Sequence, residues 1–404
     1  MKNKILLIIG GGIESLPGIK KAKEMGYKII VTDGNPNAPG FNFADEFFVK
    51  STYDIEGNLK IAEKISKRIK ISGVICFSTD VPLTVSTIAK KLELQGIPTD
   101  TAKISSNKLQ MKEKFKISNV PTPWFSEIKS VEDVNSALKK FKELVIKPID
   151  SRGSRGVQKI TQKSDIKKTI EYSKKNSPTS RIMIEEFLTG NQYSTESIII
   201  DGKCFTVGFS ERNYDRMKEF FPYFIENGGQ QPPTLDKNNI NKIKNLMEDV
   251  SNAIGVTTGI VKGDIVMTSM GPKVIEVAPR LSGGWFSSDQ IPLNSGIDIL
   301  RIAIKLCSGE KVDFDELKPK QNRGVAIRYF FPQIGKIKEI KNLAKFEKEV
   351  WVHKLEFFQN EGSVIEKQTD HTKRCGFVIT TGKTKEIAVK RAEKVVNEVK
   401  IITE

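Results

Sequence analysis

Short apolar runs alternate with longer amphipathic segments over the first hundred residues, and this alternation limits the fold more than any other feature. Strands are predicted at residues 4–11, 27–33, 49–54 and 73–78, and helices at residues 16–25, 57–69 and 82–94. Buried strands separated by helices form parallel sheets with helices on both faces. The sequence therefore predicts a doubly wound α/β domain at the N-terminus.

The pattern changes after residue 100. Residues 101–119 are polar and helical, and short strands and helices are mixed between residues 124 and 188. From residue 194 onward, alternating segments typical of an antiparallel sheet dominate. Further helices are predicted at residues 240–254, 297–308 and 385–400. The rest of the chain is thus predicted to be α+β.

The net charge of +16 raises the question of nucleic-acid binding. Only 12 of the 65 basic residues are Arg, whose bidentate guanidinium reads bases and phosphates. The many Lys residues are interleaved with acids, as in KKAKEMGYK, which is typical of exposed helix faces. We therefore expect no nucleic-acid partner, although a basic nucleic-acid-binding protein is kept as an alternative from another class.

The numbers and positions of the cysteines and histidines limit both the cellular compartment and the catalytic chemistry to be expected. The four cysteines stand far apart without a CxxC pair, which argues against a zinc site or a disulfide framework. No apolar run approaches the ~20 residues that a membrane span needs. We therefore expect a cytoplasmic protein without membrane contact. With only His353 and His371 in the chain, chemistry based on His triads or His-ligated zinc is improbable.

The glycines after the first predicted strand suggest a dinucleotide site. Gly10 and Gly12 give a GxG pattern, and Asp33 ends the second strand at the distance that ribose binding requires. Ser15 stands where the third glycine is expected. A structural turn, or a site for a ligand other than NAD, is therefore favoured, and an NAD-dependent or nucleotide-sugar enzyme remains an alternative.

A lysine at the end of an apolar strand precedes a second glycine-rich segment. In ELVIKPIDSRGSRGV, Lys147 is followed by a loop that offers backbone N–H groups and hydroxyls, at Ser151, Gly153, Ser154, Arg155 and Gly156. A positive charge facing several free N–H groups suits a polyphosphate. The GxxxxGK[ST] pattern is absent, so this is not a Walker loop, and an ordinary polar hairpin remains the alternative.

The strand IMIEEFLTG ends in two acids and two apolar residues. The backbone of Glu185, Glu186, Phe187 and Leu188 could present N–H and C=O groups to the edge of an adenine. An edge strand without a ligand explains the same residues equally well.

The segment DIVMTSMGPKVIEVAPR reads as a hairpin that turns at Met270-Gly271. If pairing is centred on Met270, Asp264 and Glu276 are directly opposite each other. Two opposed carboxylates on one sheet face repel unless a cation lies between them, and Mg²⁺ is held by one or two carboxylates together with substrate phosphates. The hairpin therefore predicts a metal site, and Arg280 with the following Ser282, Gly283 and Gly284 predicts an adjoining anion site.

The order of these segments resembles the ATP-grasp superfamily. A doubly wound domain is followed by SNKLQMKEKFKISNVPTP, by VIKP with its glycine loop, by EEFLTG and by EVAPRLSGG. Within the superfamily, the chain is most similar to the branch of biotin carboxylase, carbamoyl-phosphate synthetase, the purine-pathway enzymes and the L-amino-acid ligases. The resemblance covers essentially the whole chain.

The resemblance also implies roles for individual residues. Lys108 and Lys147 would contact the nucleotide phosphates, and residues 151–156 would close over them. Residues 185–188 would bind adenine, while Gln192 stands where many relatives have an acid for the ribose hydroxyls. Asp264 and Glu276 match the Mg²⁺-binding acids, and Ala278 replaces a common third ligand. Arg280 matches the arginine of the transferred phosphate, with Ser282, Gly283 and Gly284 beside it, and Glu226 would contact the substrate amine.

The resemblance further implies four domains and a reaction. The predicted ATP-grasp fold has a pre-ATP-grasp domain (1–105), a small lobe (106–193), a large lobe (194–315) and a biotin-carboxylase-like C-terminal domain (316–404). The implied enzyme is an ADP-forming carboxylate–amine or carboxylate–thiol ligase that uses ATP and Mg²⁺, with Mn²⁺ as a substitute, through an acyl phosphate. A carbamoyl-phosphate-synthetase-like or purine-pathway carboxylating or formylating activity stays open, as does a homodimer.

Overall fold

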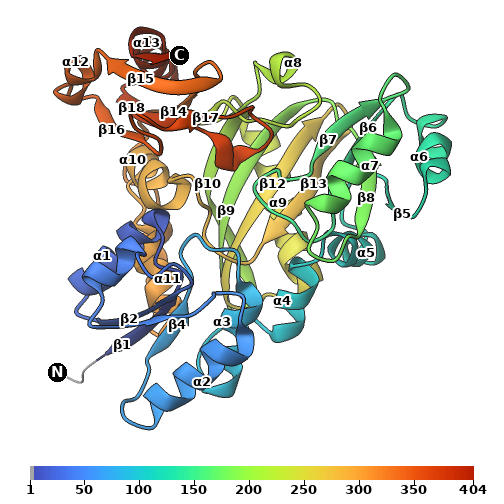
Figure 1. The fold of residues 1–404 in the computed structure, drawn as a ribbon. Coiled ribbons are helices and arrows are strands. Elements are labelled where there is room, and N and C mark those ends of the chain that lie inside the picture. Colours follow the sequence, from blue (N-terminus) through green and yellow to red (C-terminus); the bar gives the residue numbers. More distant parts are fainter. Residues whose placement is uncertain (1–3) are drawn as a thin grey trace.

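The computed structural model describes residues 4–404 and begins with a parallel four-stranded sheet (lower left in Figure 1). Its strand order is β3-β2-β1-β4, formed by β1 (Ile5–Ile9), β2 (Lys28–Asp33), β3 (Glu46–Val49) and β4 (Gly73–Ile75). Alternate β1 residues pack on opposite faces, Leu6 and Ile8 on one and Leu7 on the other. The predicted doubly wound sheet is therefore present.

Helices cover both faces of this sheet. α1 (Leu16–Glu24) and α11 (Ile299–Cys307) share a core with one face, and α2 (Ile55–Ser66) and α3 (Pro82–Lys91) share a core with the other. The third strand was wrongly predicted at residues 49–54. β3 instead spans Glu46–Val49, and Asp54 accepts a hydrogen bond from the Gly57 N–H as the N-cap of α2.

A second, antiparallel sheet has the strand order β5-β8-β6-β7. It is formed by β5 (Phe125–Ile128), β6 (Glu143–Pro148), β7 (Gln158–Thr161) and β8 (Ile182–Glu186). α6 (Val131–Leu138) and α7 (Ile166–Lys175) share a core with it. α4 (Thr99–Ser105) and α5 (Lys108–Ile117) lead into this part of the chain, which lies at the right in Figure 1.

The largest sheet has eight antiparallel strands in the order β13-β12-β9-β10-β11-β14-β18-β16. These strands are β9 (Asn191–Ile200), β10 (Lys203–Asn213), β11 (Gly228–Gln231), β12 (Gly259–Thr268), β13 (Gly271–Ala278), β14 (Gly324–Phe330), β16 (Val352–Phe357) and β18 (Gly376–Gly382). α9 (Lys237–Ile254) and α5 pack on its β12–β13 end. Since β11 pairs with β14, the sheet continues across the predicted boundary at residue 315.

The C-terminal segment adds a small sheet of order β17-β15-β19, at the top left in Figure 1. It comprises β15 (Gly335–Lys341), β17 (Val364–Ile365) and β19 (Lys400–Thr403). The predicted last helix is α13 (Lys385–Glu398), and the strand β19 after it was not predicted. The remaining short α-helices are α8 (Met217–Phe220), α10 (Ile291–Ser295) and α12 (Leu343–Glu347).

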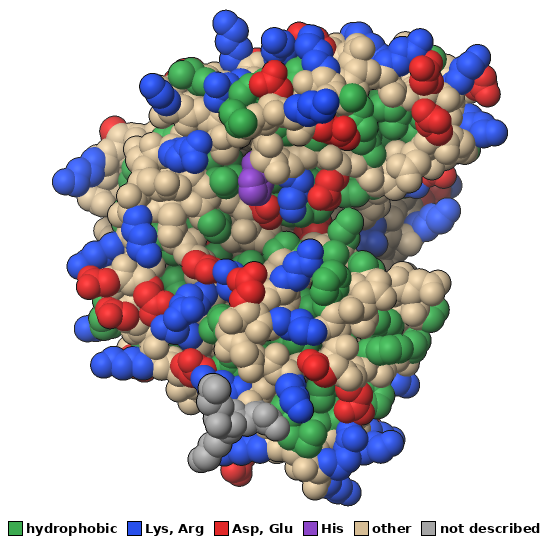
Figure 2. Space-filling view, turned by 90° about the vertical axis from the view of Figure 1, so that its left-hand side faces the viewer, with side chains coloured by type: hydrophobic (Ala, Val, Ile, Leu, Met, Phe, Trp, Pro, Cys, Tyr) green, Lys and Arg blue, Asp and Glu red, His purple; other side chains and the backbone are tan. Residues whose placement is uncertain are grey.

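Basic side chains are spread over the surface. Figure 2 shows Lys and Arg dispersed across the visible face among acids, rather than gathered into one patch. Across residues 4–404, no helix has both the length and the apolar character needed to span a bilayer.

Candidate active site

One large cavity, of about 1110 Å³, is bordered by all four predicted parts of the chain. All but one of the residues to which the resemblance assigns a nucleotide, metal or substrate role line it: Lys108, Lys147, Ser151, Gly153, Ser154, Arg155, Glu185, Glu186, Phe187, Leu188, Gln192, Glu226, Asp264, Glu276, Arg280, Ser282, Gly283 and Gly284. The exception is Gly156, where an added Cβ would meet Pro148 and Asn176 at 2.7 Å. Gly156 therefore serves the packing of the loop, and the structure places the others around one space.

The two acids of the β12–β13 hairpin are paired as predicted, although for a different reason. Thr268 pairs with Gly271, so Ser269 and Met270 form the turn. If the strands continued from this turn without interruption, Asp264 would lie opposite residue 275. An extra residue in β13 shifts the register, so that Asp264 pairs with Glu276. The predicted opposition is confirmed, whereas its centre at Met270 was wrong.

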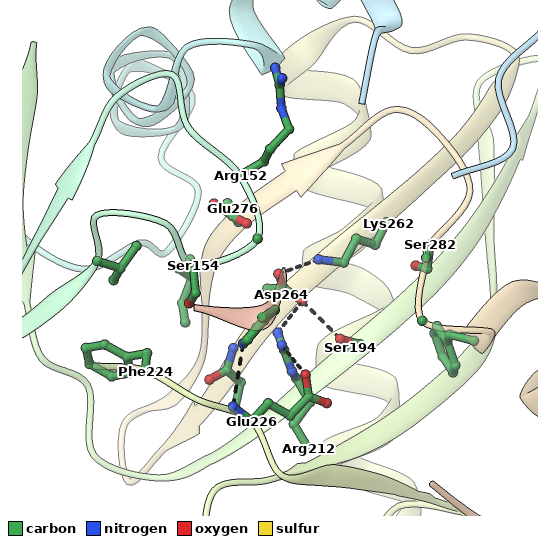
Figure 3. Close-up of a pocket in the computed structure, with 18 of the residues that line it drawn as sticks. Arg152, Ser154, Ser194, Arg212, Phe224, Glu226, Lys262, Asp264, Glu276 and Ser282 are labelled. Atoms are coloured by element: carbon green, nitrogen blue, oxygen red, sulfur yellow. Dashed lines mark hydrogen bonds and ion pairs between the residues drawn. The ribbon is translucent and has the colours of Figure 1, made fainter. Parts of the chain in front are cut away.

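Asp264 lies among polar and basic side chains on the sheet (Figure 3). Its carboxylate accepts hydrogen bonds from Lys262 Nζ (2.5 Å), Arg212 Nη1 (3.2 Å) and Ser194 Oγ (3.0 Å). Burial alone would raise the pKa of Asp264, but Lys262 and Arg212 hold it below its usual value. The carboxylate is therefore ionised at neutral pH and can serve as a hard oxygen ligand.

Glu276 is held ionised by lysines. Lys108 Nζ lies 3.5 Å from Glu276 Oε2. Burial opposes ionisation, yet Lys108, Lys147 and Lys262 hold the pKa of Glu276 far below its usual range. Among the described residues, no group of three or more His, Cys, Asp or Glu side chains forms a metal cluster. The two opposed carboxylates are thus the acidic oxygen ligands that this hairpin offers.

A buried ion triad lies beside these acids, and the sequence analysis missed one of its members. Glu185 Oε1 lies 2.6 Å from Lys147 Nζ, and Glu185 Oε2 lies 2.9 Å from Lys112 Nζ. Burial lowers the pKa of Lys112 to about 8, partly offset by Glu185. The spacing of Lys108 and Lys112, four residues apart on one helix face, was the available signal.

The strand end at Glu185–Leu188 offers fewer free backbone groups than predicted. The Glu186 N–H donates to Trp124 O (2.8 Å) and the Phe187 N–H donates to Glu143 O (3.3 Å). The side chain of Glu185 faces lysines rather than solvent. An adenine edge contacting this segment therefore finds the Glu186 and Phe187 N–H groups already occupied.

The glycine-rich loop reaches across the cavity from β6. Gly153 and Ser154 adopt left-handed backbone angles, with φ of 64° and 62°. Lys108 Nζ donates to Ser151 O (2.5 Å), and Gly153 O accepts from the His371 N–H (3.1 Å). Arg152 contacts the N-terminal domain, where its Nη1 donates to Tyr53 Oη (2.5 Å). The loop therefore contacts both the N-terminal domain and the C-terminal segment.

Arg280 and the loop after it form a second anchored region. Arg280 Nε donates to Asp80 Oδ1 (3.1 Å), and Arg280 Nη1 donates to Leu281 O (2.8 Å). Under this loop, the Ser282 N–H (3.2 Å) and Ser287 Oγ (2.8 Å) donate to Glu196 Oε2. Burial raises the pKa of Glu196 to about 7.

Glu226 lines the cavity, but its carboxylate is already paired. Glu226 Oε2 accepts from Arg212 Nη2 (2.6 Å) and Arg374 Nη2 (3.3 Å), and Arg374 stacks 3.7 Å from the centre of the Tyr329 ring. His371, which the sequence analysis set aside, also lines the cavity. Burial and nearby cations lower the pKa of His371 far below its usual value, so it is neutral.

The first glycine turn contributes to the same cavity rather than to a dinucleotide site of its own. Asp33 accepts hydrogen bonds from the Gly11 N–H (2.8 Å) and the Asn35 N–H (2.8 Å), so its carboxylate stabilises the turn. Glu14, three residues further along, accepts from the Gly284 N–H (2.8 Å) and lines the cavity. This geometry favours the structural interpretation of the turn.

Two family models match separate parts of the chain. The sequence matches a model of the ATP-grasp domain over residues 105–284 and a model of the L-amino acid ligase C-terminal domain 2 over residues 328–404. A phosphoribosylamine–glycine ligase from Methanococcus maripaludis is 25% identical over 381 residues, covering 86% of this chain and 82% of that protein.

Solved structures show the same fold over the whole chain. The L-amino acid ligase from Bacillus licheniformis has a TM-score of 0.84 at 20% identity and covers 100% of both chains. A biotin carboxylase domain from Hydrogenobacter thermophilus, solved with MgADP, ADP and bicarbonate, has a TM-score of 0.76 at 15% identity, with coverage of 100% of this chain and 91% of that one. The predicted mixed α/β ATP-grasp fold is confirmed, and the chain combines an ATP-grasp domain (residues 105–284) with an L-amino acid ligase C-terminal domain 2 (residues 328–404).

Proposed function

We propose that this ligase activates a carboxylate as an acyl phosphate at the expense of ATP, releases ADP, and passes the acyl group to an amine. The observation that carries the proposal is the acid pair Asp264 and Glu276 on one sheet face, surrounded by lysines and beside the 1110 Å³ cavity. Such a site gathers cations around the place where phosphate charge develops, which is the main task in phosphoryl transfer.

Mg²⁺ fits the donor set that the hairpin offers. Two ionised carboxylate oxygens are hard ligands, and a pair of them leaves coordination positions for phosphate and water. We propose that Asp264 and Glu276 hold Mg²⁺, which when bound would neutralise the charge of the nucleotide phosphates. Mn²⁺ prefers similar ligands and would substitute for it.

The remaining residues take their proposed roles from their place in the cavity. Lys108, Lys147 and the backbone of residues 151–155 would orient the phosphates, and Arg280 would bind the transferred phosphoryl group. Gln192 and Ala278 line the cavity as well, but a ribose acid and a third metal ligand are missing at these positions. No side chain is required as a covalent nucleophile, because the acyl phosphate is itself reactive.

The proposed binding site of the substrate amine contains both acidic and basic side chains. Since Glu226 is paired with Arg212 and Arg374, an amine would share this carboxylate with two guanidinium groups. Ser282, Gly283 and Gly284 would border the acyl group.

We also propose that the chain is divided into the parts 1–105, 106–193, 194–315 and 316–404 and that the protein is cytoplasmic. We propose a homodimer as well, because the biotin carboxylase domain of Hydrogenobacter thermophilus is described as a dimer.

A matrix of carboxylates against amines, scored by ATP-dependent phosphate release, tests the proposal. We expect phosphate release that needs both partners of one pair, and ADP in equal amount. Phosphate release without any acceptor across the whole matrix, or AMP as the nucleotide product, would contradict it.

A further inference from the structure

Asp80 lies between two arginines that belong to distant parts of the chain. It follows β4, and its carboxylate reaches both Arg280 Nε, at 3.1 Å from Oδ1, and Arg152 Nε, at 3.3 Å from Oδ2. Arg280 follows the β12–β13 hairpin, whereas Arg152 belongs to the glycine-rich loop. One carboxylate of the N-terminal domain thus joins the two segments proposed to surround the transferred phosphate.

The ion pair with Asp80 fixes the orientation of the Arg280 guanidinium group. With Nε bonded to Asp80 and Nη1 bonded to Leu281 O, two of the three guanidinium nitrogens are occupied, and Nη2 makes no hydrogen bond to other described residues. Burial would raise the pKa of Asp80, but Arg280 and Arg152 keep it below its usual value. The carboxylate therefore stays charged and offsets the repulsion between the two guanidinium groups.

The same contact fastens the glycine-rich loop. Besides its ion pair with Asp80, Arg152 stacks on Tyr53, with the guanidinium carbon 4.7 Å from the ring centre, and bonds to its hydroxyl. On the opposite side, the loop is attached through Gly153 O to the His371 N–H. The left-handed angles of Gly153 and Ser154 are thus held by contacts on both flanks.

We propose that Asp80 is a positioning residue, which aims Arg280 at the transferred phosphoryl group and holds the glycine-rich loop over the site through Arg152. The part concerning Arg280 rests on the proposed function, whereas the part concerning the loop does not. Neither the metal acids nor the nucleotide lysines contact Asp80 within hydrogen-bonding distance among the described residues.

The test compares Asp80→Asn, Arg152→Gln and their combination in the full chain. Asp80→Asn keeps the size of the side chain and removes its charge. Asp100→Asn, which removes an equal charge from an exposed ion pair with Lys103, is the matched control. Hydrogen exchange of residues 150–157 without nucleotide reports loop opening, exchange of α9 reports the integrity of the fold, and kcat and KM for ATP report the reaction.

We expect faster loop exchange in Asp80→Asn with unchanged exchange of α9, and a kcat lower by about tenfold to a hundredfold, as loss of a charge-assisted contact implies. Arg152→Gln should loosen the loop at least as much, because the contacts of Arg152 with Tyr53 are lost as well, but it should lower kcat less, because the Asp80–Arg280 pair remains. The double variant should exchange no faster than Arg152→Gln, and Asp100→Asn should match the wild type.

Two results would overturn the proposal: wild-type loop exchange in Asp80→Asn, or a kcat lowered no more than in Arg152→Gln. If Asp80→Asn does not fold, wild-type loop exchange in Arg152→Gln overturns it equally. If no ligase activity is found, the proposed function fails while the exchange measurements still decide the loop contact, so the two failures are distinguishable.

Discussion

The acid pair on the β12–β13 hairpin is compatible with a folded chain because cations surround it. Asp264 contacts Lys262 and Arg212, and Glu276 contacts Lys108. Removing one partner from a buried set of charges leaves another uncompensated. Substitutions here should therefore keep size and polarity, so that the charge alone is tested.

Glu276→Gln should lower turnover by about a hundredfold or more while the chain stays folded, because one of the two carboxylates proposed to hold Mg²⁺ is lost. Steady-state turnover at saturating Mg²⁺, with circular dichroism as the check on folding, measures this. Glu248→Gln on the exposed side of α9 is the control. Wild-type turnover in Glu276→Gln would remove Glu276 from the metal site.

Glu196 predicts a specific pH dependence of stability. Its folded-state pKa of about 7 lies above its unfolded value, so the native state binds more protons between about pH 4.5 and 7. The stabilisation is present below the unfolded pKa and is lost as the pH rises through 7. Urea unfolding should show the wild type losing up to about 3 kcal/mol over this interval relative to Glu196→Gln. If the unfolding free energies of the two proteins change with pH in parallel, the pKa of Glu196 is not raised.

At the scale of elements, α5 carries two lysines into the cavity region from one capped helix start. Asn107 Oδ1 accepts from the Leu109 and Gln110 N–H groups, and Lys108 and Lys112 follow on one face of the helix. The cap therefore fixes the first turn, on which the position of Lys108 depends.

Asn107→Ala should cost about 1 kcal/mol of unfolding free energy, as loss of an N-cap does, and should also weaken ATP binding. Asp236→Ala, which removes the cap of α9 through its bond to the Asn239 N–H, should lower stability similarly without affecting ATP. Urea unfolding and calorimetric ATP titration separate the two effects. Equal ATP affinities in both variants would show that the α5 cap does not position Lys108.

Local patterns predicted most elements, and the strands β1 and β2 follow from periodicity. The pairing of Asp264 with Glu276 was predicted from a symmetric turn, whereas in the structure a bulge in β13 produces it. Periodicity alone does not predict such a bulge, because one extra residue leaves the apolar pattern on either side unchanged. Likewise, the ion pair of Lys147 with Glu185 and that of Asp80 with Arg280 join residues far apart in sequence. Local sequence patterns do not predict such pairs.

At the scale of the whole molecule, three sheets meet around one cavity, and one of them spans two predicted domains. The eight-stranded sheet carries the acid pair at one end and C-terminal strands at the other (Figure 1). Arg374 and His371 of the C-terminal segment reach the same cavity as Glu14 and Asp80 of the N-terminal domain. The order of motifs predicted this assembly in outline, because each motif marks one wall of the site.

The most direct test of the acyl-phosphate route follows oxygen from substrate to product. With the carboxylate substrate identified by the phosphate-release matrix and labelled with ¹⁸O, one labelled oxygen should appear in inorganic phosphate, and ADP should be the nucleotide product. Hydroxylamine in place of the amine should trap the intermediate as a hydroxamate. Label recovered in AMP, with pyrophosphate as the second product, would contradict the acyl phosphate and the roles proposed for Arg280 and Glu276.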